Sequence, residues 1–317
     1  MSGPFGGTHL MAKSGETIDW GGVRMINAGG TSGNTNSAAG DTDSIDYVNA
    51  SGANADSADF GDLSSVRISF GAVSSTGRIV FLGGNPSYQN EMQYITPATT
   101  GNTTDFGDMD AGGAMAGHNV SNGIRGVWAG MQRTGVSHSN EIDYITIAST
   151  GNSTDFGDLD QVRGGPAGSS NGIRGLFWAG SINATPWHNK YIQYITIAST
   201  GNTTTFGNMV RIVGSHSACG NADRNISMGG HYGSLQDTIE YVNPASTSDT
   251  SDFGNLLNAQ YMNNGAETAV RGLVSGGYGN VTYENTIQYV TFATTGNATD
   301  FGNMTVGRYS HASGSGA

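Results

Sequence analysis

The sequence contains a single cysteine, Cys219, so it cannot form an internal disulfide and suits assembly in a reducing cytoplasm. Charged residues are also scarce, at 12% of the chain, and they are mostly acidic, which gives a formal net charge of −12. An acidic chain with no basic stripe is a poor partner for nucleic acid or for an anionic membrane. No apolar run approaches the roughly 18 residues of a membrane helix, and the N-terminus lacks the pattern of a signal peptide.

The common motifs of catalysis and metal binding are missing as well. There is no phosphate-binding glycine loop ending in Gly-Lys-Ser/Thr, no GxSxG and no HExxH. Asp41, Asp43 and Asp46 lack the glycine and the distal glutamate of a calcium loop. The histidines show no ligand spacing; they are His9, His118, His138, His188, His216, His231 and His311. We therefore expect no metal, no cofactor and no catalytic residues.

What the sequence does contain is a repeat. An apolar-polar-Tyr-β-branched tetrapeptide recurs every 47 to 50 residues, with its tyrosine at Tyr47, Tyr94, Tyr144, Tyr194, Tyr241 and Tyr289. Twelve or thirteen residues later comes Phe-Gly, at Phe60, Phe106, Phe156, Phe206, Phe253 and Phe301. The alternation predicts a strand at each tyrosine and another at each phenylalanine, joined by a polar turn. Sequons at Asn102, Asn152, Asn202 and Asn297 fall in this turn, where asparagine is favoured by turn chemistry.

A second aligned strand precedes each tyrosine. It opens with an arginine, at Arg24, Arg78, Arg125, Arg174, Arg224 and Arg271, and it ends in a pair that is usually Gly-Gly. A looser strand of small residues precedes the arginine, for example over 210–216. Six units of four short strands predict an all-β fold, a six-bladed β-propeller covering residues 20–317.

The two ends of the chain complement each other. Residues 307–312 form a first strand with nothing after it, whereas residues 21–24 open a second strand with nothing before it. Pairing between these termini would complete one blade, close the ring and cover two sheet edges.

The double glycine, the tyrosine strand and the aromatic strand resemble the kelch repeat, although kelch repeats usually carry tryptophan where this chain has phenylalanine. The resemblance covers most of the chain and implies the same propeller fold. We describe the repeat as kelch-like.

The six arginines and six tyrosines are interpreted as scaffold, because a group present in every blade is rarely catalytic. Each arginine is expected to pair with the aspartate before the phenylalanine, such as Asp105 or Asp155; Thr205 replaces this aspartate in one repeat. Blade-specific aromatic residues are better candidates for function, because exposed rings beside polar groups suit a ligand-binding rim. These candidates are Trp187, His188, His231, Tyr232, Tyr278 and Tyr283.

Residues 1–19 stand outside the repeat as a short N-terminal arm. Its candidate anchor residues are Pro4, Phe5, Leu10 and Met11, which so short a segment cannot bury by itself. The opening Ser-Gly-Pro-Phe-Gly and the repeated Tyr-Ile-Thr-Ile-Ala-Ser-Thr-Gly-Asn resemble virion proteins of tailed bacteriophages, including tail-fibre-like proteins of marine phages.

That resemblance implies a non-enzymatic virion protein, present in multiple copies and assembled in the host cytoplasm. Its arm would attach to other virion proteins, and its propeller would bind a glycan or protein of the host surface during adsorption. One alternative is a free, lectin-like propeller that binds glycans. A remote alternative is an enzyme of the galactose-oxidase or sialidase type, which would need one singular polar cluster at the channel mouth.

Overall fold

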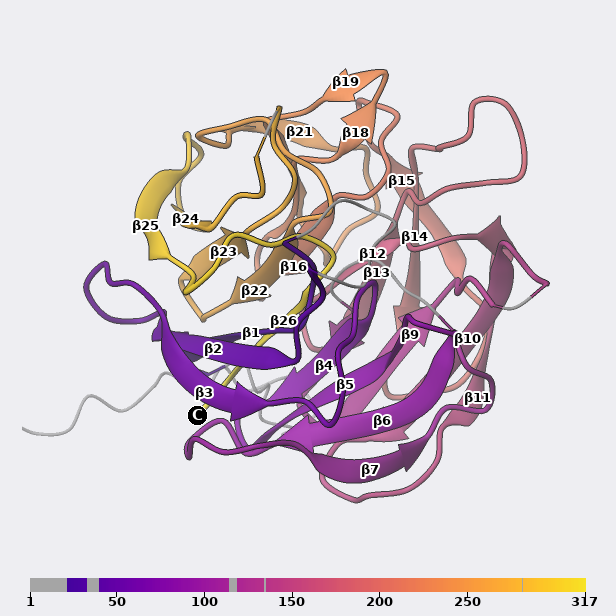
Figure 1. Ribbon diagram of the computed structural model, residues 1–317. Coiled ribbons are helices and arrows are strands. Elements are labelled where there is room, and N and C mark those ends of the chain that lie inside the picture. The colour runs from indigo at the N-terminus through magenta and orange to yellow at the C-terminus, as the bar shows by residue number, and fades with distance from the viewer. Residues whose placement is uncertain (1–21, 33–39, 114–118, 134, 281) are drawn as a thin grey trace, which may run out of the picture.

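The computed structural model describes residues 22–32, 40–113, 119–133, 135–280 and 282–317. The arm and its four anchor residues lie outside these ranges. The described residues form six four-stranded antiparallel sheets arranged around a central axis (Figure 1). This arrangement is a six-bladed β-propeller and confirms the fold predicted from the repeat.

We number the blades in chain order and give their strands from the axis outward. Blade 1 contains β26 (Ala312–Gly316), β1 (Arg24–Ala28), β2 (Ser44–Asn49) and β3 (Ala58–Asp62). Blade 2 contains β4 (Gly71–Ser75), β5 (Arg78–Gly84), β6 (Gln89–Ile95) and β7 (Thr104–Asp108). Blade 3 contains β8 (Val120–Ser121), β9 (Arg125–Ala129), β10 (Ser139–Thr146) and β11 (Thr154–Arg163).

The remaining blades follow the same order. Blade 4 contains β12 (Ala167–Ser170), β13 (Arg174–Trp178), β14 (Tyr191–Thr196) and β15 (Thr204–Asn208). Blade 5 contains β16 (Ser217–Gly220), β17 (Asn225–Met228), β20 (Thr238–Val242) and β21 (Ser251–Asn255). Blade 6 contains β22 (Asn264–Glu267), β23 (Arg271–Ser275), β24 (Thr286–Thr291) and β25 (Thr299–Asn303). A small hairpin, β18 (His231–Tyr232) with β19 (Ser234–Leu235), lies in a loop of blade 5.

Blade 1 is built from both ends of the chain, as predicted. β26 pairs antiparallel with β1 over five residue pairs, from Arg24 opposite Gly316 to Ala28 opposite Ala312. The innermost strands, however, begin later than the sequence suggested. Residues 210–216 and 307–311 are crossovers between blades, because the chain turns through a left-handed residue, Ser215 or Ser310, before each strand starts.

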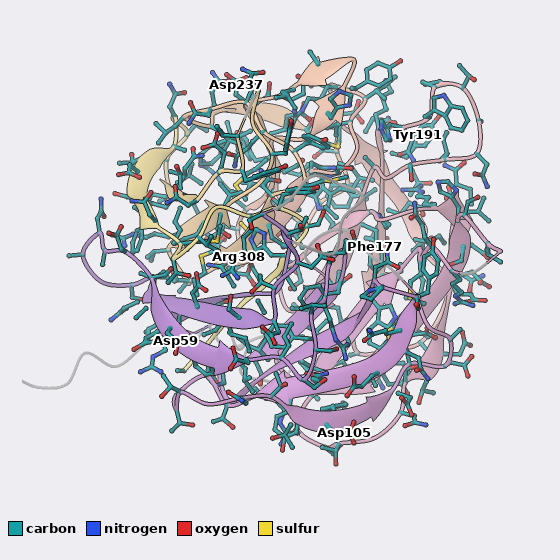
Figure 2. The ribbon with its side chains drawn as sticks, viewed as in Figure 1. Asp59, Asp105, Phe177, Tyr191, Asp237 and Arg308 are labelled. Atoms are coloured by element: carbon teal, nitrogen blue, oxygen red, sulfur yellow. The ribbon has the colours of Figure 1, made fainter. Side chains whose placement is uncertain are left out.

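The arginine at the start of each second strand is bound differently from our prediction. Its guanidinium lies over the tyrosine ring of its own blade, with the central carbon 4.1 to 4.9 Å from the ring centroid. Its Nη1 donates a hydrogen bond of 2.7 to 3.2 Å to a backbone carbonyl of the next blade, at Pro97, Ile147, Ile197, Pro244, Phe292 or Ala50. The predicted pairing with the aspartate before phenylalanine is therefore wrong. Those aspartates are exposed at the outer edge, where Asp59 and Asp105 are seen in Figure 2.

This arrangement makes Arg125 and Arg174 equivalent, whereas the aspartate hypothesis would have made Arg174 the less important residue. We expect Arg125→Ala and Arg174→Ala to lower the free energy of unfolding by similar amounts, about 2 kcal/mol each. Each change removes one cation–π contact and one charged hydrogen bond. Urea unfolding of the two variants tests this expectation. A loss at Arg174 smaller by more than about 1 kcal/mol would contradict it.

The polar turn after each tyrosine strand also fastens neighbouring blades. In every blade an Asn or Asp side-chain oxygen of this turn accepts a hydrogen bond of 2.8 to 3.1 Å from a backbone N–H of the preceding blade. The acceptors are Asn102, Asn152, Asn202, Asp249, Asn297 and Asp56. The contact of Asp56 with Asn303 joins the last blade to the first. The asparagines of the four sequons therefore help to join neighbouring blades.

The polar residue before each tyrosine is buried, although strand alternation alone places it toward solvent. Asp46 accepts hydrogen bonds from the N–H (3.0 Å) and hydroxyl (2.8 Å) of Thr305 in the preceding blade, and it pairs with Arg308. Gln288 accepts from Leu257 N–H at 2.7 Å in the same way. In blade 3, burial raises the pKa of Asp143 to about 6; Arg133 opposes the shift, and Asp110 and Asp155 add to it. In blades 1, 2, 5 and 6 the buried polar residue thus joins its blade to the crossover that enters it.

Candidate functional site: an aromatic row on the loop face

The two faces of the ring carry different connections. One face, here called the turn face, holds the short turns between first and second strands and the repeated turns between third and fourth strands. The other, the loop face, holds the loops between second and third strands, which differ in length from blade to blade, and the crossovers between blades. Because the loops vary between blades while the turns repeat, blade-specific chemistry gathers on the loop face.

Five rings on this face form a continuous series, which we call the aromatic row. His231 lies 5.5 Å from Tyr261, and Tyr261 lies 5.7 Å from Tyr278, measured between ring centroids. Tyr278 lies 5.6 Å from Tyr283 and 5.9 Å from Tyr309. Tyr283 and Tyr309 are stacked at 5.5 Å with an interplanar angle of 17°. The row therefore crosses three adjacent blades, 5, 6 and 1.

Backbone pairing holds the row in place. Tyr261, in the crossover from blade 5 to blade 6, exchanges hydrogen bonds of 3.2 and 2.8 Å with Tyr278, in the loop that follows β23. Tyr278 also forms a bridge with Tyr283 within that loop. Tyr309 N–H donates to Thr31 O at 3.1 Å, which ties the row to the loop after β1. A loop fixed at these points presents its rings without paying much ordering entropy on binding.

Members of the row differ in exposure. Tyr309 is only 3% exposed and supports the stacked Tyr283 from behind, whereas His231, Tyr261, Tyr278 and Tyr283 are partly exposed. Burial and the neighbouring tyrosines raise the pKa of Tyr309 to about 12, with Asp41 adding to the shift. Burial and Tyr278 also raise the pKa of Tyr261. Tyr261 and Tyr309 are therefore neutral phenols at physiological pH.

The residues predicted as a rim do not all join this row. His231, Tyr278 and Tyr283 belong to it. His188 and Tyr232 form a separate edge-to-face pair at 6.4 Å, next to the row through the β18–β19 hairpin. Trp187 is 69% exposed and has no ring neighbour among the described residues. The predicted rim residues are thus divided among the aromatic row, the His188–Tyr232 pair and the separate side chain of Trp187.

Sequence reasoning missed Tyr261 and Tyr309, because both were assigned to loosely defined first strands. The signal was present, because the two tyrosines occupy the same position in their repeats. Each lies two residues before the residue that leads into the innermost strand, which is Asn263 or His311. The corresponding residue in blade 5 is Gly214. Aligning the crossovers, and not only the strands, would have singled out these two tyrosines.

A buried polar cluster lies beside the row in blades 5 and 6. His216, Gln260 and Asn263 are at most 3% exposed, and none of their side-chain nitrogen or oxygen atoms has a hydrogen-bond partner among the described residues. They meet around the Gly229-Gly230 pair, where a Cβ on Gly230 would lie 2.8 Å from that of His216. Both glycines have positive φ, so glycine is required there. Such a cluster needs ordered water or a polar ligand to complete its hydrogen bonds.

His216 and His311 occupy equivalent positions near the axis, as their spacing in the sequence indicated. His311 Nε2 lies 3.0 Å from Ser275 Oγ, which in turn donates to Asn27 Oδ1 at 2.8 Å. Burial lowers the pKa of each histidine to about 3; Arg211 and His188 contribute at His216, and Arg308 contributes at His311. Both histidines are therefore neutral in the folded protein.

These shifts predict a loss of stability in acid. The unfolded histidines bind protons near their ordinary pKa of 6.5, whereas the folded ones bind them only near 3. Stability is thus complete above about pH 6.5 and declines as the pH falls toward 3, by about 1.4 kcal/mol per pH unit for each histidine. We expect His216→Asn and His311→Asn, which copy Asn263, each to reduce this slope in urea unfolding. An unchanged slope in the double variant would contradict the assignment.

The structure offers no metal centre in its described part. No group of three or more His, Cys, Asp or Glu residues comes together there in a way that could hold a metal ion. Asp46, one of the three aspartates considered for calcium, is buried in its pair with Arg308. No described helix has the length and apolar character needed to cross a membrane.

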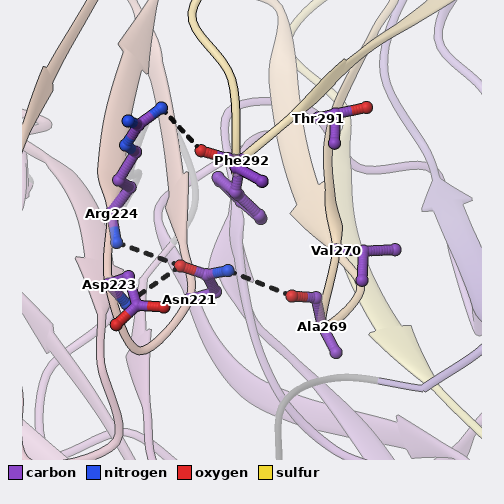
Figure 3. Close-up of a pocket in the computed structure, with 8 residues that line it drawn as sticks. Asn221, Asp223, Arg224, Ala269, Val270, Thr291 and Phe292 are labelled. Carbon is purple, nitrogen blue, oxygen red and sulfur yellow. Dashed lines mark hydrogen bonds between the residues drawn. The ribbon is translucent and has the colours of Figure 1, made fainter.

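A groove between blades 5 and 6 opens on the turn face (Figure 3), with a volume of about 530 Å³. It is lined by Asn221, Asp223, Arg224, Ala269, Val270, Thr291, Phe292 and Ala293. Arg224 Nη1 donates to Phe292 O at 2.7 Å, and Asn221 Nδ2 donates to Ala269 O at 3.0 Å. The Arg224 contact recurs between all the other blades, so it belongs to the scaffold, and we place the candidate site on the loop face.

No protein-family model matches this chain, and no curated protein is similar to its sequence.

Proposed function

We propose that this chain is a non-enzymatic binding module that recognises the host surface during adsorption of a tailed-phage particle. The observation that carries the proposal is the aromatic row. A scaffold that repeats its arginine, tyrosine and turn contacts in six blades gathers these aromatic residues on only three of them. Residues that depart from the repeat on one face are expected to serve binding, whereas repeated residues serve the fold.

The sequence resemblances described above support the proposal that this binding module belongs to a phage particle. The kelch-like repeat suits a binding propeller, and the repeat wording and N-terminal Ser-Gly-Pro-Phe-Gly resemble virion proteins. The chain enters the propeller at Gly22, on the turn face, where Val23 N–H donates to Ala317 O at 2.8 Å. Attachment to other virion proteins through residues 1–19 would therefore leave the aromatic row facing outward. Several copies on one particle would strengthen a weak single contact.

Deleting residues 1–15 tests the attachment half of the proposal. We expect the truncated protein to keep its melting temperature, because every described blade strand stays intact, but to be missing from purified particles analysed by mass spectrometry. As soluble protein it should still bind host cells as the full chain does. Normal incorporation into particles would show that the anchor lies on the propeller instead.

A free, lectin-like propeller is the second candidate, because the same row would serve a soluble glycan-binding protein. Mass spectrometry of particles separates the two. A chain absent from particles that still binds cells through the row would favour the free lectin.

A further inference from the structure

We infer that the aromatic row binds a neutral oligosaccharide, a conclusion that rests on the proposed binding function and names its ligand class. The reasons are the chemistry of the rings, the charges beside them and the length of the row.

The rings offer the apolar surface and the polar edge that a sugar requires. A pyranose has a face of C–H groups that packs on an aromatic ring, and a rim of hydroxyls that needs hydrogen-bond partners. Tyr261, Tyr278 and Tyr283 are partly exposed, and among the described residues we find no hydrogen bond to their phenol groups. Each can therefore pack through its ring and exchange a hydrogen bond through its hydroxyl.

The charges beside the row favour a neutral ligand over an acidic one. Asp41 and Tyr309 both form a backbone bridge with Thr31, which places Asp41 beside the row, and Glu284 directly follows Tyr283 in the chain. Carboxylates accept hydrogen bonds from sugar hydroxyls but repel the carboxylates of acidic sugars.

Cations that would offset this repulsion are already engaged. Among the described residues of the crossovers into blades 5, 6 and 1, the arginines are Arg211 and Arg308, and they pair with Glu240 and Asp46 respectively. Arg308, which is labelled in Figure 2, is fully buried beside β2, where its Nη1 donates to Ser44 O. An acidic glycan would thus meet carboxylates without a free guanidinium, which places it at a disadvantage.

The length of the row selects a chain of sugars. Four rings in succession, from His231 to Tyr283, are separated by steps of 5.5 to 5.7 Å, so the row is longer than one sugar ring. Tyr309 is a positioning residue, because it is buried and holds Tyr283 by stacking. We therefore expect affinity to rise from monosaccharide to tetrasaccharide.

The test uses the full chain on an array of neutral and acidic oligosaccharides, followed by titration calorimetry with the best ligand. We expect binding to a neutral oligosaccharide, weakened at least about tenfold by Tyr278→Ala or Tyr261→Ala, since each removes one stacking ring. Tyr191→Ala is the matched control, because Tyr191 is also an exposed tyrosine (46%) but lies at the start of β14, outside the row (Figure 2). Binding to acidic glycans alone, or equal binding by Tyr278→Ala, would overturn the inference.

Cell binding separates this inference from the proposed function. Fluorescent protein is applied to a panel of bacterial isolates after treatment with periodate, which cleaves sugar diols, or with proteinase K. Loss of binding after periodate treatment supports the inference that the ligand is a saccharide. Tyr278-dependent binding that survives periodate but not proteinase overturns the saccharide and leaves the adsorption role standing. Absence of Tyr278-dependent binding to all cells and glycans overturns both. Circular dichroism of each variant confirms that the blades remain folded.

Discussion

A chain that lacks residues 307–317 should lose its closed ring and melt well below the full-length protein. The deletion removes β26, the innermost strand of blade 1, which pairs with β1 and packs beside the first strands of blades 2 and 6. It also removes Arg308 and leaves Asp46 as a buried carboxylate without its cation, a loss of roughly 3–5 kcal/mol by itself. The exposed edge of β1 would then favour aggregation.

Thermal unfolding followed by circular dichroism measures this effect, and deletion of residues 1–15 is the control that leaves every blade strand intact. A synthetic peptide of residues 307–317, added to the truncated chain, should restore part of the lost stability by supplying the missing strand. A truncated chain that melts with the full-length protein would show that the terminal pairing does not stabilise the ring.

The second large effect is expected at Arg308 itself. Its Nη2 pairs with Asp46, and its Nη1 donates to the carbonyls of Gly29 and Ser44, both at 3.2 Å. Both side chains of the pair are at most 1% exposed. Arg308→Ala should therefore lower the free energy of unfolding by roughly 3–5 kcal/mol, because it leaves the buried Asp46 carboxylate without its cation and removes a donor from two carbonyls.

Arg163 provides the matched comparison for Arg308. It enters blade 4 as Arg308 enters blade 1, with Nη1 bonds of 3.3 Å to the carbonyls of Ala179 and Tyr191. Its carboxylate partner, Asp160, is 49% exposed, so water can solvate that charge when the arginine is removed. Arg163→Ala should thus cost less than Arg308→Ala, and Arg308→Met with Asp46→Leu should recover part of the loss. Equal losses at the two arginines in urea unfolding would show that burial of the partner does not decide the cost.

The loop face shows how far pattern reasoning reaches. His231, Tyr278 and Tyr283 could be named in advance, because they break a repeat that is otherwise regular. Their contact with Tyr261 and Tyr309 could not, because the five residues come from three repeats and from two kinds of connection. Whether such residues come into contact depends on how adjacent blades pack against each other, and strand alternation does not specify that packing.

The six repeated arginines also show that the sequence pattern identifies a residue's role more readily than its contacts. Their role as scaffold was correctly inferred from their sixfold recurrence, but their partners were not. Opposite charge suggested an aspartate, whereas the structure gives each guanidinium a tyrosine ring in its own blade and a carbonyl in the next. The ring removes carbonyls of each blade from solvent at the seam, and a buried carbonyl needs a donor.

The sequence by itself therefore determined the number of blades, the order of their strands and the closure of the ring through both termini. These features follow from a period of 47 to 50 residues and from alternation along each strand, and both can be read along one chain. Tertiary structure alone decided which side chains lie between blades. It buried polar residues such as Asp46 and Gln288 that alternation places outside, and it assembled the aromatic row. The physical reason is that blades meet across seams joining residues far apart in sequence, where close packing and hydrogen-bond satisfaction outweigh local pattern.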